Sequence, residues 1–191
     1  VQAFYQAAGR PSLNLKVLVE GEEESGSPHL APTVERLRER LACDLVLSAD
    51  GAMWRADRPS VTVAGQEPAR VARAIEAHLR AVLPAGHRLA VARHGPGSAA
   101  FSSDPALPGL ALAEDVLEEV LGRQPLRVAM GATIPVGAVL AEHLGAGTVF
   151  FSFSTADEDY HAPNGFFRLS SVRAGVEAWV RLLGRLGGGP G

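Results

Sequence analysis

Four carboxylates crowd one short stretch of the chain. In EGEEES, Glu20 is followed after one glycine by Glu22, Glu23 and Glu24. A zinc hydrolase needs histidine and carboxylate ligands for the metal. It also needs a carboxylate that does not bind the metal and can take a proton from water. Adjacent glutamates at a strand-to-helix turn can divide these tasks, so the stretch predicts part of a metal site. The alternative is a solvated acidic turn, which the helix dipole favours at the start of a helix.

Two further candidate ligands follow apolar runs far along the sequence. Asp50 ends CDLVLSAD, and His161 closes STADEDYH, which continues the apolar run TVFFSFS. Because ligand-binding residues in parallel sheets lie at the carboxyl ends of the strands, we expect both side chains at the same edge of a sheet. Asp50 could instead only form a turn with Gly51, and His161 could be an ordinary loop histidine. The acidic run 157–159 is interpreted as solvated or as supporting His161.

The elements that must position these side chains alternate between strands and helices. This alternation, with several continuously apolar strands, predicts an α/β sandwich whose largely parallel sheet is covered on both faces. The expected strands cover residues 14–20, 43–50, 87–94, 125–132 and 148–154, and the expected helices cover residues 31–42, 67–84, 109–122, 134–146 and 167–186.

Composition removes several classes of function. Hydrophobic residues make up 47% of the 191 residues, which is enough for a core, and the net charge of −3 comes without a basic stripe for nucleic acid. The single cysteine excludes an internal disulfide and a thiolate zinc cluster. No apolar run is long enough for a spanning helix, so we expect a cytoplasmic protein without a membrane partner. The first residues resemble a helix end feeding a strand, so we expect the chain to start within a domain.

Four motifs occur in a fixed order: EGEEESGS (20–27), VLSADG (46–51), GATIPVGAV (131–139) and HAPNGFF (161–167). Together they resemble the successive signatures of the co-catalytic metallopeptidases of family 20 in clan MH, which include aminoacylase, carnosinase, carboxypeptidase G and succinyl-diaminopimelate desuccinylase relatives. The resemblance implies a three-layer α/β/α zinc-peptidase-like catalytic domain with a mostly parallel or mixed sheet. It also implies an inserted lid, or dimerisation, domain.

The resemblance also implies the roles of individual residues. Glu23 corresponds to the general base, Glu24 and His161 to ligands of one metal ion, and Asp50 to a ligand of the other. The implied reaction is hydrolysis of the amide bond of a dipeptide or an N-acyl amino acid at a dinuclear zinc site. Cobalt or manganese would accept the same ligands.

Three residues are implied in substrate binding. Gly131 and Thr133 correspond to a turn that holds the carboxylate end of the substrate, and Asn164 braces the histidine loop. A homodimer is expected where the lid is present, because the lid usually carries the dimer contacts in this family.

The chain departs from the family pattern in ways that support a second hypothesis. No His-x-Asp motif occurs, the bridging aspartate is absent, and Ala129 and Gly165 replace residues common in relatives. Most of the lid is missing, which predicts catalytic segments at 1–63 and 99–187, a lid remnant at 64–98 and a flexible tail at 188–191. The second hypothesis is therefore an inactive remnant that serves as a binding or structural module. A nucleotide-binding domain is disfavoured because the carboxylates of EGEEESGS would repel phosphate.

Overall fold

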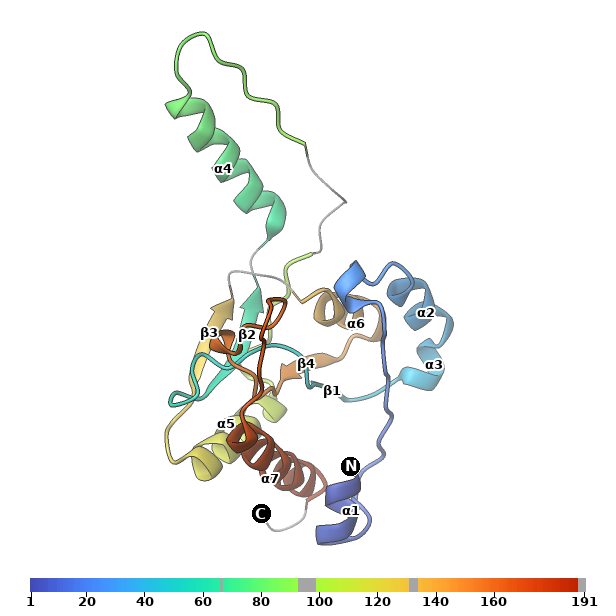
Figure 1. Cartoon of the computed structure of the whole chain (residues 1–191). Helices are drawn as coiled ribbons and strands as arrows, with labels where there is room; N and C mark the ends of the chain where they lie inside the picture. Colours follow the sequence, from blue (N-terminus) through green and yellow to red (C-terminus); the bar gives the residue numbers. More distant parts are fainter. Residues whose placement is uncertain (66, 93–98, 131–133, 189–191) are drawn as a thin grey trace.

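The computed structural model describes residues 1–65, 67–92, 99–130 and 134–188 (Figure 1). Its strands are β1 (Leu45–Ser48), β2 (Ser60–Gly65), β3 (Leu126–Met130) and β4 (Gly147–Phe150). Its helices are α1 (Gln2–Ala8), α2 (Leu30–Arg36), α3 (Arg38–Leu41), α4 (Pro68–Val82), α5 (Pro108–Leu121), α6 (Pro135–Leu144) and α7 (Leu169–Leu186), with single 3-10 turns η1 (Glu23–Ser25) and η2 (Ala156–Glu158).

The four strands form one mixed sheet in the order β1-β4-β2-β3. β1 is parallel to β4, β2 is parallel to β3, and the two pairs meet through a single antiparallel bridge between Thr62 and Phe150. This arrangement confirms the expected α/β class with a mostly parallel or mixed sheet.

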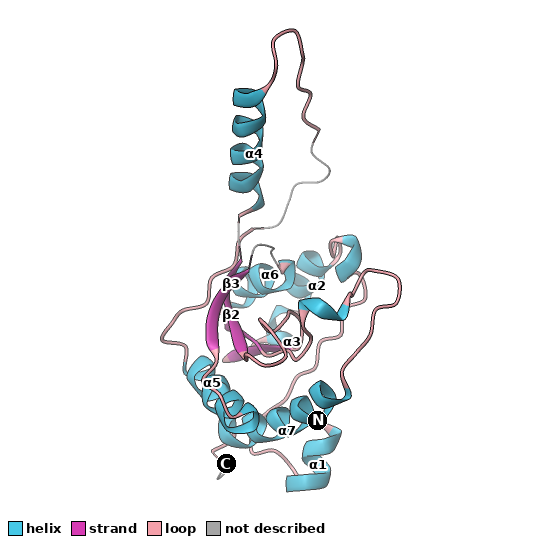
Figure 2. Cartoon of the chain, turned by 60° about the vertical axis from the view of Figure 1, so that its left-hand side comes forward, coloured by secondary structure: helices cyan, strands magenta, loops and turns pink. Residues whose placement is uncertain are grey.

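Helices cover both faces of the sheet, which gives three layers (Figure 2). β4 shows how one strand serves both faces, because successive side chains of a strand point in opposite directions. Val149 is fully buried in the cluster formed with α5 and α7, whereas the next residue, Phe150, is buried against Phe101 and Ile134 beside α6. α2 packs on α6 through Leu30, Val34 and Leu140, and α1 contacts α7.

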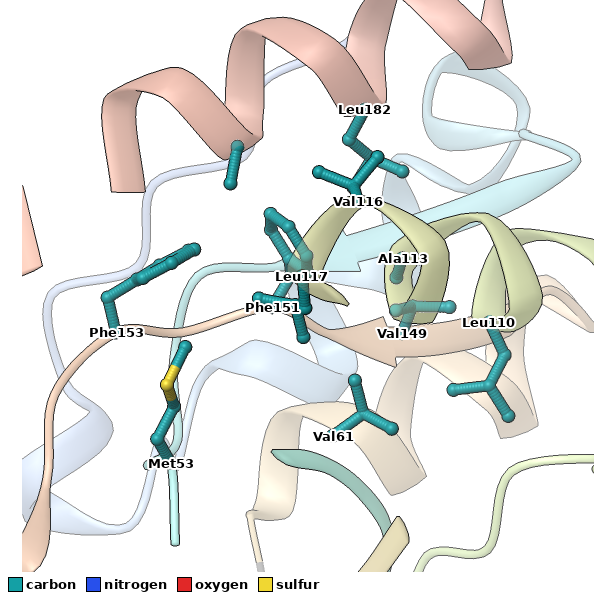
Figure 3. Packing of buried hydrophobic residues seen from close by; sticks show 11 residues of the cluster. Met53, Val61, Leu110, Ala113, Val116, Leu117, Val149, Phe151, Phe153 and Leu182 are labelled. Carbon is teal, nitrogen blue, oxygen red and sulfur yellow. The ribbon is translucent and has the colours of Figure 1, made fainter. Parts of the chain in front are cut away.

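The largest core cluster lies between the sheet and the helices α5 and α7 (Figure 3). Phe151, directly after β4, is 1% exposed and contacts Phe153 and Trp179 edge-to-face, with ring centroids 5.4 and 5.2 Å apart. Edge-to-face aromatic pairs add to the stabilisation from buried area. The segment that follows β4 toward His161 is therefore anchored in the core at its start.

Two expected strands are not strands in the structure. Residues 14–20 form a loop in which Val17 is 71% and Val19 is 87% exposed, and residues 87–92 also form no strand. β-branched composition raises strand propensity, but a strand also needs a partner for its ladder and a surface to cover its face. Neither segment pairs with another strand among the described residues. Residues 93 and 94 of the second prediction lie outside those described.

α4 projects away from the sheet and its helices (Figure 1). It is amphipathic, as its sequence indicates, but none of its residues is buried, and Ile75 and Val82 are more than half exposed. β2 runs two residues beyond the predicted boundary at 63, and α4 begins three residues after β2 ends. The division into catalytic segments and lid remnant remains a prediction. Most of the expected tail, residues 189–191, lies outside the described residues.

The expected helix over residues 31–42 is divided at Leu37 into α2 and α3. Leu37 has φ −102° and ψ 13°, outside the regular helical range. The other expected helices are present: α4, α6 and α7 are slightly shorter than expected, and α5 is shifted by one residue toward the N-terminus. In the described part of the chain, no helix combines the length and apolar character needed to cross a membrane.

Candidate metal centre

The candidate site lies where the parallel strands β1 and β4 end side by side. Ser48 is paired with Phe150 at the last position of the two strands, and the amide of Phe151 donates to the carbonyl of Ser48 at 2.8 Å. Beyond the strands, the Ser152 hydroxyl donates to the Gly51 carbonyl at 2.7 Å. These bonds hold the Asp50 turn against the segment that leads to His161. The Asp50 turn and the start of that segment therefore lie at the same edge of the sheet.

The glutamate turn is held by its own hydrogen bonds and not by a preceding strand. The carbonyl of Glu22 accepts hydrogen bonds from the amides of Ser25 and Ser27, which closes the single turn η1. The Glu22 carboxylate lies 2.8 Å from Nδ1 of His29 and accepts a hydrogen bond from the His29 amide. The hydrogen bond from His29 holds the pKa of Glu22 below its ordinary value. The carboxylate of Glu22 is therefore occupied by hydrogen bonds within the turn, whereas Glu23 and Glu24 are not held in this way.

Glu24 and His161 are the two predicted ligands that the structure brings into contact. Oε2 of Glu24 lies 3.4 Å from Nε2 of His161, although the two residues are 137 positions apart (161 − 24). Two ligands at zinc-bond lengths of about 2.1 Å and a tetrahedral angle stand about 3.4 Å apart, so this separation fits two neighbouring positions around one ion. Both side chains are well exposed, at 72% and 66%, and are open to a ligand from solvent.

Glu23 lies in a different electrostatic setting from Glu24. Partial burial raises the pKa of the Glu23 carboxyl, and the nearby charges of Asp50, Glu24 and Glu20 raise it further, while His161 lowers it. Glu23 thus holds its proton to a higher pH than a free glutamate. A carboxylate with a raised pKa is suited to accept and return a proton near neutral pH. Asp50 and His161 thus both act on the Glu23 carboxyl through their charges.

In the metal-free protein, we expect Asp50→Asn to lower the pKa of Glu23 while leaving it above that of a free glutamate. The substitution removes one repelling charge, and the larger contribution, burial, remains. A carbon NMR titration of the Glu23 carboxyl measures the shift. Asp44→Asn removes an exposed carboxylate beside Cys43 and is the control. An unchanged Glu23 pKa in Asp50→Asn would contradict the placement of Asp50 beside it.

The pair of Glu24 and His161 makes only part of a coordination sphere. Among the residues that the structure describes, no group of three or more His, Cys, Asp or Glu side chains is arranged to hold a metal ion. The structure therefore fits the absence of the His-x-Asp motif from the sequence: these residues suit two positions around an ion, and further ligands would have to complete it.

The predicted substrate residues are only partly described. Gly131 and Thr133 lie outside the described residues. Asn164 is exposed in the loop of His161 and has a positive φ of 67°, close to the 66° of His161 itself. Its roles in substrate binding and in bracing the loop remain predictions.

Sequence reasoning included Glu158 only in an acidic run that was either solvated or supporting His161, and it did not single out Arg168. The acidic run 157–159 was expected to be solvated or supporting, but Glu158 is only 2% exposed and is paired with Arg168 at 3.2 Å. A signal for Glu158 was present, because Thr155 precedes it by three positions as in a capping box, and the structure forms that box. Arg168 carried no comparable signal in the sequence.

Comparison with known proteins places this geometry in a family. The sequence matches the model of peptidase family M20/M25/M40 over residues 1–185. The chain belongs to this family. The match confirms the family resemblance that the sequence motifs indicated. No curated protein sequence matches the chain significantly.

Solved structures of M20 relatives share the fold. The dipeptidase Dug1p from Saccharomyces cerevisiae superposes with a TM-score of 0.75 at 13% identity, over 98% of this chain and 69% of that one. Human carnosine dipeptidase 1 superposes with a TM-score of 0.73 at 11% identity, over 98% of this chain and 70% of that one. At such low identity the likeness supports the fold of the M20 catalytic domain and not a particular substrate.

Proposed function

We propose that this M20 chain provides the general base and metal ligands of a metal-dependent hydrolase that cleaves the amide bond of dipeptides or N-acyl amino acids. The observation that carries the proposal is the contact between Glu24 and His161 at 3.4 Å, directly beside the protonatable Glu23. Two side chains that could ligate one ion, next to a carboxylate with a raised pKa, are part of what metal-assisted hydrolysis needs, and further ligands would complete the coordination of the ion.

Each residue has a separate part in the proposed reaction. Glu24 and His161 would hold one zinc ion, and Asp50 would contribute to a second, with cobalt or manganese as substitutes. The metal would polarise the scissile carbonyl and make water more acidic. Glu23 accepts the proton as water attacks the carbonyl carbon, and then returns it to the leaving amine nitrogen. The raised pKa of Glu23 helps it to carry that proton between the two steps.

Membership of the family and the names of its structural neighbours support the proposed substrate class. Both are dipeptidases, one from yeast and one from human. A small substrate also suits a site at an exposed sheet edge, where Glu24 and His161 are reached directly from solvent.

A hydrolysis assay after metal exchange tests the proposal. We expect the zinc-loaded protein to release free amino acid from a panel of dipeptides and N-acetyl amino acids, to lose this activity on treatment with a chelator, and to regain it with added zinc or cobalt. Absence of both bound metal and hydrolysis would contradict the proposal and favour the inactive binding or structural module.

A further inference from the structure

The loop that carries His161 has an unusual backbone. Asp159, His161 and Asn164 all have positive φ values, of 52°, 66° and 67°. Residues other than glycine adopt this region uncommonly, although Asp, His and Asn tolerate it better than most. Three such residues within six positions give the loop a tightly turned backbone, whose conformation depends on how its two ends are held.

One buried carboxylate ties the two ends of this loop together. Oε2 of Glu158 accepts a hydrogen bond from the amide of Thr155, and Oε1 accepts one from the amide of Arg168, each at 3.2 Å. Thr155 precedes the loop and Arg168 follows it. Because Glu158 is 2% exposed, water does not compete for these bonds, and a buried charge without them would be costly.

The guanidinium of Arg168 adds further hydrogen bonds between the two ends of the loop. Nη1 donates to Oε1 of Glu158 at 3.2 Å and to the Thr155 hydroxyl at 2.8 Å, and Nη2 donates to Oδ2 of Asp157 at 2.7 Å. The same group lies 4.9 Å from the centre of the Phe166 ring. Arg168 is three-quarters buried, so its charge is held in one place against the base of the loop.

Further hydrogen bonds connect the base of the His161 loop to the loop interior and to the neighbouring Asp50 turn. The amide of Phe166 donates to the carbonyl of Glu158 at 3.0 Å, and the amide of Ala162 donates to the carbonyl of Asp159 at 3.0 Å. On the other side, Thr155 forms a parallel bridge with Met53, which follows the Asp50 turn. The base of the His161 loop and the Asp50 turn are thus parts of one hydrogen-bonded unit.

We propose that Glu158 and Arg168 are positioning residues that hold the His161 loop in its left-handed conformation and thereby present Nε2 of His161 toward Glu24. Neither residue touches the candidate site, and both act through His161. The consequence for metal binding rests on the proposed function, whereas the consequence for loop order does not. Removing the Arg168 side chain takes away its guanidinium contacts with Glu158, Thr155 and Asp157, while the Arg168 amide keeps its hydrogen bond to Glu158.

The test compares Arg168→Ala and Arg168→Lys with Arg181→Ala in the full chain. Arg181 lies on α7, the helix that begins directly after Arg168, and pairs with exposed Glu177 and Glu119, so its removal is the matched control. Amide hydrogen exchange of residues 159–166 reports loop order without metal. We expect Arg168→Ala to speed this exchange at least about tenfold, Arg168→Lys to restore it in part, and Arg181→Ala to leave it unchanged. Unchanged exchange of the buried α5 amides verifies that each variant is folded.

Zinc titration followed through the ring signals of His161 provides the second readout. We expect Arg168→Ala to weaken binding at His161 by about 10–100-fold, as found when groups that orient metal ligands are lost. Loop exchange at the wild-type rate in Arg168→Ala, or faster exchange with unchanged zinc affinity, would overturn the positioning role. Faster exchange together with no zinc binding by the wild-type protein would overturn the proposed function while leaving loop ordering by Arg168 supported.

Discussion

Glu23→Gln is expected to reduce kcat for amide hydrolysis by about 10²–10⁴-fold while leaving zinc content unchanged. The amide keeps the size of the side chain but cannot take a proton from water, and the loss corresponds to that of a positioned general base. Partial burial and neighbouring charges raise the pKa of Glu23, while Glu24 contacts His161 and Glu22 is hydrogen-bonded to His29. Steady-state kinetics and metal analysis of the same samples measure both quantities.

Glu24→Gln is the matched comparison for this prediction, because the two residues are adjacent and the substitution is the same. We expect it to lose both zinc and activity, since a ligand is changed and not the base. Equal loss of zinc in the two variants would show that the roles are not divided between Glu23 and Glu24.

The largest effect on stability is expected for Phe151→Ala, which should lower the free energy of unfolding by about 3–5 kcal/mol. The side chain is fully buried between the sheet and α7 and makes two edge-to-face contacts, so its removal leaves a cavity that the surrounding helices fill only in part. Chemical denaturation followed by circular dichroism measures the change.

Phe167→Ala is the control for Phe151→Ala, because Phe167 is 53% exposed. We expect a change within about 0.5 kcal/mol, as is usual for surface substitutions. A loss of less than about 1 kcal/mol in Phe151→Ala would contradict the packing of α7 on the end of β4.

Local sequence patterns predicted most of the fold and failed where an element depends on a partner. The helices α4 to α7 were predicted because apolar spacing and flanking proline or glycine define a helix locally. The segments 14–20 and 87–94 have the composition of strands, but a ladder is a property of two segments, and composition does not reveal whether the second is present. Without a partner strand among the described residues, segment 14–20 is a loop in which Val19 is 87% exposed.

In the candidate site too, residues in local motifs could be predicted, whereas features that depend on distant residues could not. Glu24 and His161 could be predicted because each lies in a motif of the M20 family, and the structure brings them within 3.4 Å. The burial of Glu158 could not be inferred from its acidic neighbours, because it depends on Arg168 ten positions later folding back over it. Capping boxes are local, but the partner of a buried charge is set by the tertiary fold.

The most direct test of the central claim is a zinc titration of the metal-free protein, followed through the imidazole signals of His161. If Glu24 and His161 are ligands of one ion, zinc shifts these signals to saturation, and Glu24→Gln weakens the binding that they report. Zinc that leaves His161 unperturbed, or binding at His161 that is equally tight in Glu24→Gln, would contradict a metal site built on this pair.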